Sequence, residues 1–152
     1  MSRTDIEAYL NGLHAEAERL AALIDVPENL RLKAHKPTGD GCWLTLYWRE
    51  ANDGDDQDGY YVALMSREDG QEWELSEVSL EYTDNLLFKF YEGVTHQMVM
   101  REQEQKSGTD RRRIMFAAQE ALMARLNPDW SNRTSQRHEQ ILRNFPFADK
   151  TQ

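Results

Sequence analysis

The chain has 152 residues and a formal net charge of −9, with 39% hydrophobic and 30% charged residues. Four Trp, five Phe and six Tyr supply the large side chains of a core, which excludes a wholly disordered chain. The length suits one domain and is short for two, so we expect a single domain over residues 1–152. The acidic balance argues against nucleic-acid binding, because phosphates require a broad basic face.

The first predicted element is an amphipathic helix. Thr4 and Glu7 have the spacing of a capping box, which indicates the start of this helix. Its apolar residues recur at intervals of three and four, which places them on one face. They are Ile6, Leu10, Leu13, Ala17, Leu20 and Ile24. Pro27 marks the end of the helix.

The next part of the chain predicts an antiparallel sheet. Residues 42–48 and 60–65 are rich in β-branched and aromatic side chains, and residues 30–36 are a candidate for a further short strand. Asp69-Gly70 has the signal of a tight hairpin and leads into a strand over 71–78. In that strand the apolar and acidic residues alternate, so we expect one apolar face and one acidic, solvated face. The apolar face is expected to carry Trp73 and Leu75, and the other Glu72, Glu74 and Ser76.

After Ser79 the pattern is helical to the end of the chain. We expect a central helix over about 84–105, interrupted at Gly108, and a second helix over 110–126. Asn127-Pro128 has the cap and first-residue chemistry of a last helix, which ends around Asn144. The predicted class is α+β: an N-terminal helix, a three- to four-stranded antiparallel meander, and three C-terminal helices packed on the sheet.

Cysteine usage and hydropathy indicate a cytoplasmic protein. The amino terminus meets charge by Arg3, and no stretch approaches the roughly 20 apolar residues of a membrane span or the apolar region of a signal peptide. The single cysteine, Cys42, cannot form an internal disulfide and fits a reducing compartment. We therefore expect a cytoplasmic location and no membrane partner.

No arrangement of residues predicts an enzyme, a metal site or a cofactor. The acidic loop before Gly59 fails as a calcium loop, because its spacing would put Gly54 and Met65 at ligand positions. The four histidines lie in four different segments and lack ligand partners at metal spacing. Cys42 lies in an apolar strand that would raise its pKa, so it is a poor nucleophile. A site that forms only in three dimensions remains an alternative.

The charge is distributed unevenly along the sequence. Residues 50–84 contain twelve acidic residues and one basic residue, a balance of −11, while the rest of the chain has a balance of +2. The bland interpretation is a set of solvated loops that keep the protein soluble. The functional interpretation is a surface that steers a basic partner. The basic run Arg111–Arg113 lies near Asp110 and Glu104, so we expect it to pair within the protein.

Four short segments resemble the immunity protein 63 family of bacterial polymorphic-toxin systems. They span about Ser79 to Phe147. The segments are Asp84–Tyr91 with Val94-Thr95, Asp110–Arg113 with Phe116, Leu126–Trp130, and Asn144–Phe147. The resemblance implies a small cytoplasmic protein that binds and neutralises a cognate toxin without catalysis, with contact-dependent growth inhibition as one setting. It does not imply which toxin.

The acidic segment and the resemblance together predict a partner surface. Many antibacterial toxins are nucleases with basic clefts, so we expect a basic, nuclease-like toxin domain bound by a monomer of this chain. The toxin-facing residues are expected to be Glu50, Asp53, Asp55, Asp56, Asp58, Glu68, Asp69, Glu72 and Glu74, with Tyr60 or Tyr82 as aromatic anchors. Another acidic interaction module, a nucleic-acid mimic or an adaptor, is the alternative function. The C-terminal helices are the alternative contact surface.

Overall fold

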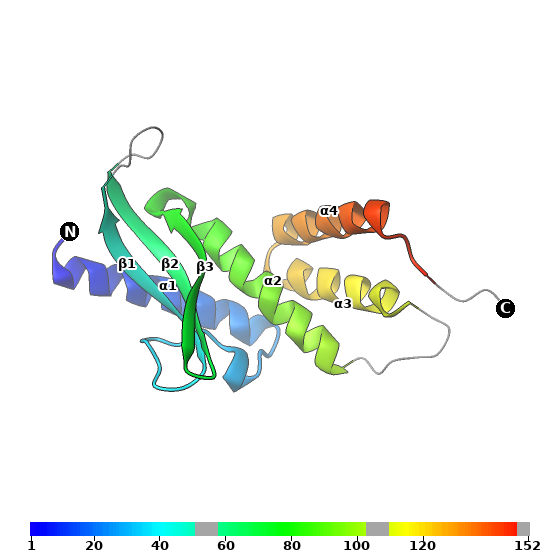
Figure 1. Ribbon diagram of the computed structural model, residues 1–152, viewed down its shortest axis with the longest axis horizontal. Coiled ribbons are helices and arrows are strands. Elements are labelled where there is room, and N and C mark those ends of the chain that lie inside the picture. Colours follow the sequence, from blue (N-terminus) through cyan, green and yellow to red (C-terminus); the bar gives the residue numbers. More distant parts are fainter. Residues whose placement is uncertain (51–57, 103–109, 149–152) are drawn as a thin grey trace. The chain divides into compact units, whose positions relative to one another are not determined.

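The computed structural model confirms the α+β class and the predicted order of elements. It describes residues 1–50, 58–102 and 110–148 (Figure 1). The helices and strands are α1 (Arg3–Leu23), β1 (Gly41–Arg49), β2 (Gly59–Glu68), β3 (Gln71–Ser79), α2 (Thr83–Glu102), α3 (Arg111–Leu126) and α4 (Pro128–Asn144). Two 3-10 turns, Glu28–Leu30 and Leu80–Tyr82, precede β1 and α2. The predicted end of α2 near Gln105 and the break at Gly108 lie outside the described residues.

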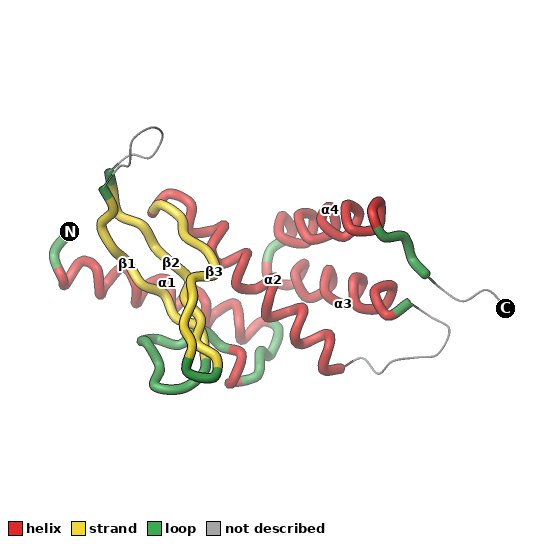
Figure 2. Tube along the Cα trace, in the orientation of Figure 1, coloured by secondary structure: helices red, strands yellow, loops and turns green. Residues whose placement is uncertain are grey.

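The chain divides into two compact units, Met1–Phe90 and Tyr91–Gln152. The first unit contains α1, the sheet and the start of α2, and the second contains the rest of α2 with α3 and α4 (Figure 2). Each unit has buried apolar residues of its own. The prediction of one domain over the whole chain stays a prediction.

The sheet of the first unit is an antiparallel meander with the order β1-β2-β3. Asp69 and Gly70 both have positive φ, 51° and 79°, as the predicted tight hairpin turn requires. The candidate strand at 30–36 is wrong, because its only strand-like contact is a single bridge from Lys33 to Trp43. Pro37 and the turn residues that follow it prevent a longer ladder.

The cap of the α1 helix, Ser2, lies two residues before the predicted cap at Thr4. The Ser2 side chain accepts a hydrogen bond from the Asp5 backbone, and the Asp5 carboxylate accepts one from the Ser2 backbone, so the capping box is Ser2–Asp5. The predicted cap at Thr4 and Glu7 is therefore wrong; Glu7 instead pairs with Arg3. The predicted apolar stripe is confirmed, since all six of its residues are buried or half-buried. The α1 helix packs against β1.

A β-bulge changes the predicted alternation in β3. Met65 pairs with Glu74 and Leu64 pairs with Ser76, so Leu75 is an extra residue without a partner in β2. An extra residue moves every later side chain to the opposite face. The prediction of a buried apolar face with Trp73 and Leu75 is wrong: these side chains are 41% and 43% exposed. The bulge accounts for Leu75, whereas Trp73 precedes it and pairs with Ser66 near the hairpin end of the sheet.

The bulge also determines which β3 residues reach the core. Val78 pairs with Val62, and Ser76 pairs with Leu64, so both lie on the face of the sheet where Leu46, Val62 and Leu64 are buried. Glu77 pairs with Ala63, on the opposite face, which also carries Glu72 and Glu74. We call this opposite face the open face; its acidic residues come from β3.

The second unit is built on well-capped helices. Asp110 caps α3, and Asn127 caps α4 with Pro128 at the first helical position, as predicted. The Tyr91 and Trp130 rings stack with centroids 6.1 Å apart. Around them lie the buried side chains of Val94, Met98, Val99, Met123 and Leu126.

The contrast between two leucines tests the position of the bulge. Leu64 is 1% exposed and Leu75 is 43% exposed. We expect Leu64→Ala to lower the free energy of unfolding by about 2–5 kcal/mol, because it leaves a cavity. Leu75→Ala should change it by no more than about 0.5 kcal/mol. Urea denaturation of both variants measures the difference, and equal losses would contradict the observed register.

Candidate interaction surfaces

The acidic residues predicted to meet a partner lie at both ends of the sheet. Glu50 and Asp58 are exposed where β1 ends and β2 begins, and Glu68 and Asp69 are exposed at the turn between β2 and β3. Because β2 has ten residues and a strand rises ~3.3 Å per residue, the two ends are about 30 Å apart (Figure 1). Asp53, Asp55 and Asp56 lie outside the described residues. The described carboxylates therefore form separate groups.

Two of the three carboxylates on the open face are already paired. Glu72 accepts a hydrogen bond from Arg67 and lies 3.1 Å from the Lys36 amine, and these two partners lower its pKa. Glu77 pairs with Arg49. Within the described residues, Glu74 has no ion pair or hydrogen bond of its side chain. Of the predicted contact residues on this face, Glu74 is thus the one whose charge is uncompensated.

The same basic residues also cover aromatic rings of the open face. Arg67 and Lys36 each lie 5.8 Å from the Trp43 ring, and Arg49 lies 5.2 Å from the Tyr61 ring. Cation–π contacts of this length hold the guanidinium and ammonium groups in place. Each of these basic side chains therefore contacts both an aromatic ring and a carboxylate. Their positive charges reduce the negative electrostatic potential in the middle of the open face.

The two predicted aromatic anchors lie in different surroundings. Tyr82 is 56% exposed. Tyr60 is half-buried, with its hydroxyl 2.7 Å from the Met1 nitrogen and its ring 5.0 Å from Trp48, edge to face. Trp48, the last residue of the strand predicted over 42–48, is 53% exposed and was not among the predicted contact residues. The position of Trp48 next to a charged loop was the available signal.

A buried polar network links α2, α3 and α4 in the second unit. His138 is 6% exposed, and its Nδ1 and Nε2 lie 2.8 Å from Glu120 Oε2 and 3.0 Å from Gln119 Oε1. The Gln119 amide nitrogen donates to the Glu92 carbonyl and to Thr95, which fixes the orientation of its oxygen. Both ring nitrogens therefore lie within hydrogen-bond distance of oxygen atoms. His138 is therefore a hydrogen-bonded core residue.

A groove of about 270 Å³ borders this network. Phe116, which stacks on His138 at 3.8 Å, forms part of its wall, together with His96 and Ile141. The Thr134 hydroxyl donates to the Trp130 carbonyl, and both His138 nitrogens have partners. Neither side chain is thus available as a nucleophile or base without breaking existing hydrogen bonds.

Removing the His138 ring tests the network. We expect His138→Ala to lower the free energy of unfolding by about 1–3 kcal/mol, because it leaves the acceptors on Gln119 and Glu120 without their donors. His96→Ala, at an exposed position on the same groove, is the matched control and should change it by at most about 0.5 kcal/mol. Urea denaturation compares the variants; equal effects would mean that the hydrogen bonds of His138 do not stabilise the unit.

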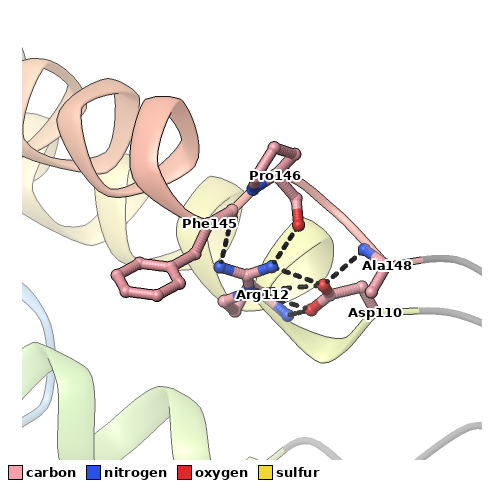
Figure 3. Close-up of polar contacts among 5 residues, drawn as sticks. All are labelled: Asp110, Arg112, Phe145, Pro146 and Ala148. Atoms are coloured by element: carbon pink, nitrogen blue, oxygen red, sulfur yellow. Dashed lines mark hydrogen bonds and ion pairs between the residues drawn. The ribbon is translucent and has the colours of Figure 1, made fainter.

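The predicted internal pairing of the arginine run is confirmed at Arg112. Its guanidinium lies 2.7 Å from the Asp110 carboxylate and donates to the carbonyl oxygens of Phe145 and Pro146, at 2.7 and 2.9 Å. Asp110 also accepts a hydrogen bond from the Ala148 backbone, at 3.0 Å (Figure 3). This C-terminal clasp, Asp110 and Arg112 with residues 145–148, ties the start of α3 to the segment after α4. Its charges are occupied within the chain.

The clasp predicts acid sensitivity. The Arg112 guanidinium first, and then the Ala148 backbone N–H, hold the pKa of Asp110 well below its usual range. A carboxyl whose pKa is lowered in the folded state stabilises the fold above its unfolded pKa, about 4, and loses this contribution as pH falls. We expect Asp110→Asn to lower the melting temperature at pH 7 and to have a smaller effect near pH 3. Asp129→Asn, an exposed acid in the first turn of α4, is the control and should show no such pH dependence.

The described residues contain neither a metal-ligand cluster nor a membrane-spanning helix. Among residues 1–50, 58–102 and 110–148, no group of three or more His, Cys, Asp or Glu side chains could hold a metal ion. No helix within these ranges is long and apolar enough to cross a membrane. Cys42 is half-buried, and burial raises the pKa of its thiol.

More than half of the chain matches one protein family. The model of the family "Immunity protein 63" matches residues 58–140. The chain belongs to this family. No curated protein and no solved structure matches it. The immunity protein 63 match begins just before β2 and ends within α4, so it includes the bulged strand, Asp110 and Arg112, and leaves out α1, β1 and residues 145–148.

Proposed function

We propose that this immunity protein neutralises a cognate antibacterial toxin by binding it in the cytoplasm, without catalysis. Membership of the immunity protein 63 family supports the neutralisation of a toxin, and it is the observation on which the proposal rests. The engaged hydrogen bonds of His138 and Thr134 agree with an action by binding, because neither residue is free for chemistry. Contact-dependent growth inhibition is the setting that we favour.

The distribution of charge supports a basic toxin domain, such as a nuclease, as the partner. The segment 50–84 has a balance of −11, and exposed carboxylates at Glu50, Glu68 and Glu74 have no partner among the described residues. Uncompensated charge of one sign accelerates the association with a partner of the opposite sign. Immunity requires association faster than damage, so a steered encounter suits this role.

The proposed contact surface consists of the residues predicted from the sequence, but these residues differ in how available they are to a partner. Glu72 is less available than its neighbours, because Arg67 and Lys36 already bind it. Glu50, Asp58, Glu68, Asp69 and Glu74 are exposed and can meet a basic surface. Tyr82 is the more exposed of the two predicted anchors. We propose that the chain binds the toxin as a monomer.

Charge reversal at three exposed carboxylates tests the acidic contact. The triple variant Glu50→Lys, Glu68→Lys, Glu74→Lys should associate about tenfold or more slowly with the toxin domain encoded by the adjacent gene, because steering is lost. Cells that rely on this variant should be killed at lower toxin doses. Stopped-flow association at low salt and a growth-protection assay measure the two effects.

The control reverses three exposed acids outside the acidic segment. Glu28→Lys, Asp129→Lys, Glu139→Lys changes the net charge by the same amount and should retain nearly normal association and protection. An equal effect of both triple variants would show that net charge alone matters. Absence of both binding and protection by the unmodified chain would overturn toxin neutralisation. Binding to a DNA-binding protein that is unrelated to the toxin would instead favour the nucleic-acid mimic.

A further inference from the structure

The β3 strand presents apolar side chains to solvent at the edge of the sheet. It pairs with β2 on one side only, and its first five residues, Gln71–Leu75, are all exposed. Trp73 is 41% exposed and makes no ring contact with the described residues, and Leu75 is 43% exposed. Neither side chain thus contributes fully to the core, although both are large and apolar.

The need to prevent the β3 edge from pairing with other chains explains the charges and the bulge of this strand, but not its exposed apolar side chains. Edge strands often carry charges and bulges that prevent pairing with other chains, and Glu72, Glu74 and the bulge at Leu75 are such devices. An exposed Trp and Leu have the opposite effect, because they favour association. Trp is also the residue type most enriched among the side chains that dominate binding energy at protein interfaces. The apolar pair therefore requires a different explanation.

The surroundings of the pair carry uncompensated negative charge. Glu68 and Asp69 are exposed in the turn between β2 and β3. Glu74 follows Trp73 in sequence but pairs with Met65, so Trp73 and Glu74 border the β3 edge on opposite faces of the sheet. The nearest paired bases on the sheet, Arg67 and Lys36, are held by Glu72 and by the Trp43 ring. An apolar centre with an acidic rim complements a surface that has apolar and basic side chains.

We propose that Trp73 and Leu75 are the apolar anchors of the toxin contact, and that a positively charged segment of the toxin domain docks along the edge of β3 between them and the rim of Glu68, Asp69 and Glu74. This inference rests on the proposed function and selects one end of the sheet as the contact. The exposed ring at the other end, Trp48, is already in edge-to-face contact with Tyr60. Trp48 pairs with Tyr60 and Trp73 pairs with Ser66, so the two tryptophans lie about 20 Å apart along β2.

Paired tryptophan variants test the proposal. The probe is the toxin domain encoded by the adjacent gene, co-purified with this chain, released in denaturant and refolded. Trp73→Ser and Leu75→Ser should each weaken binding at least about 30-fold, the loss typical of a central interface residue. Trp48→Ser removes a ring that is more exposed, 53% against 41%, from the opposite end of the sheet, and it should weaken binding less than about threefold, since peripheral contacts contribute little. Isothermal titration calorimetry measures each affinity.

Two further measurements separate the possible failures. Thermal unfolding should give the three variants the same melting temperature as the unmodified chain within a few degrees, which shows that a loss of binding is not a loss of folding. If a variant melts at a lower temperature, Glu74→Gln is measured in its place. This variant should weaken binding more at low salt than at high salt. If the unmodified chain does not bind the probe, the proposed function fails. If the unmodified chain binds and Trp48→Ser weakens binding more than Trp73→Ser, the toxin docks elsewhere and the inference on β3 is overturned.

Discussion

The extra residue in β3 is the constraint on which the surface of the sheet depends. Opposite Leu64 and Met65 the strand has one residue more than the ladder requires, and that residue is Leu75. The bulge keeps Val78 on the core side, and it places Glu77 beside Glu72 and Glu74 on the open face. A regular strand of the same sequence would put Leu75 beside Trp73 and would turn Val78 away from the core. The bulge thus allows one strand to serve both the core and a solvated surface.

Sequence patterns predicted the elements of this fold well, because most of them depend on local chemistry. The α1 stripe, the Asp69-Gly70 hairpin and the Asn127-Pro128 cap each follow from residues close together in the chain. The misplaced cap at Thr4 has a local cause as well, because Ser2 and Asp5 offer the same motif two residues earlier. The candidate strand at 30–36 failed because a strand needs a long partner ladder, which periodicity does not reveal.

The candidate site was harder to predict because it depends on register and on distant partners. Strict alternation assigned Trp73 and Leu75 to a buried face, and nothing in the local sequence signals a bulge without a glycine. The acidic residues appeared as one group because they are close in sequence, whereas ten residues of β2 separate their two ends. The pairing of Glu72 with Lys36 joins positions 36 residues apart, so its neutralisation is visible only in three dimensions.

The C-terminal clasp gives the second unit an unusual dependence on the last part of the chain. Asp110 and Arg112 hold the backbone of Phe145, Pro146 and Ala148, so residues 110–148 form a non-covalent ring around the α3–α4 hairpin. Loss of these hydrogen bonds releases the segment after α4 and also removes a partner of Asp110, the cap of α3. The start of α3 and the segment after α4 therefore lose their contacts together. A backbone cleavage directly after α4 would therefore remove the carbonyl partners of Arg112 and the N–H partner of Asp110 together.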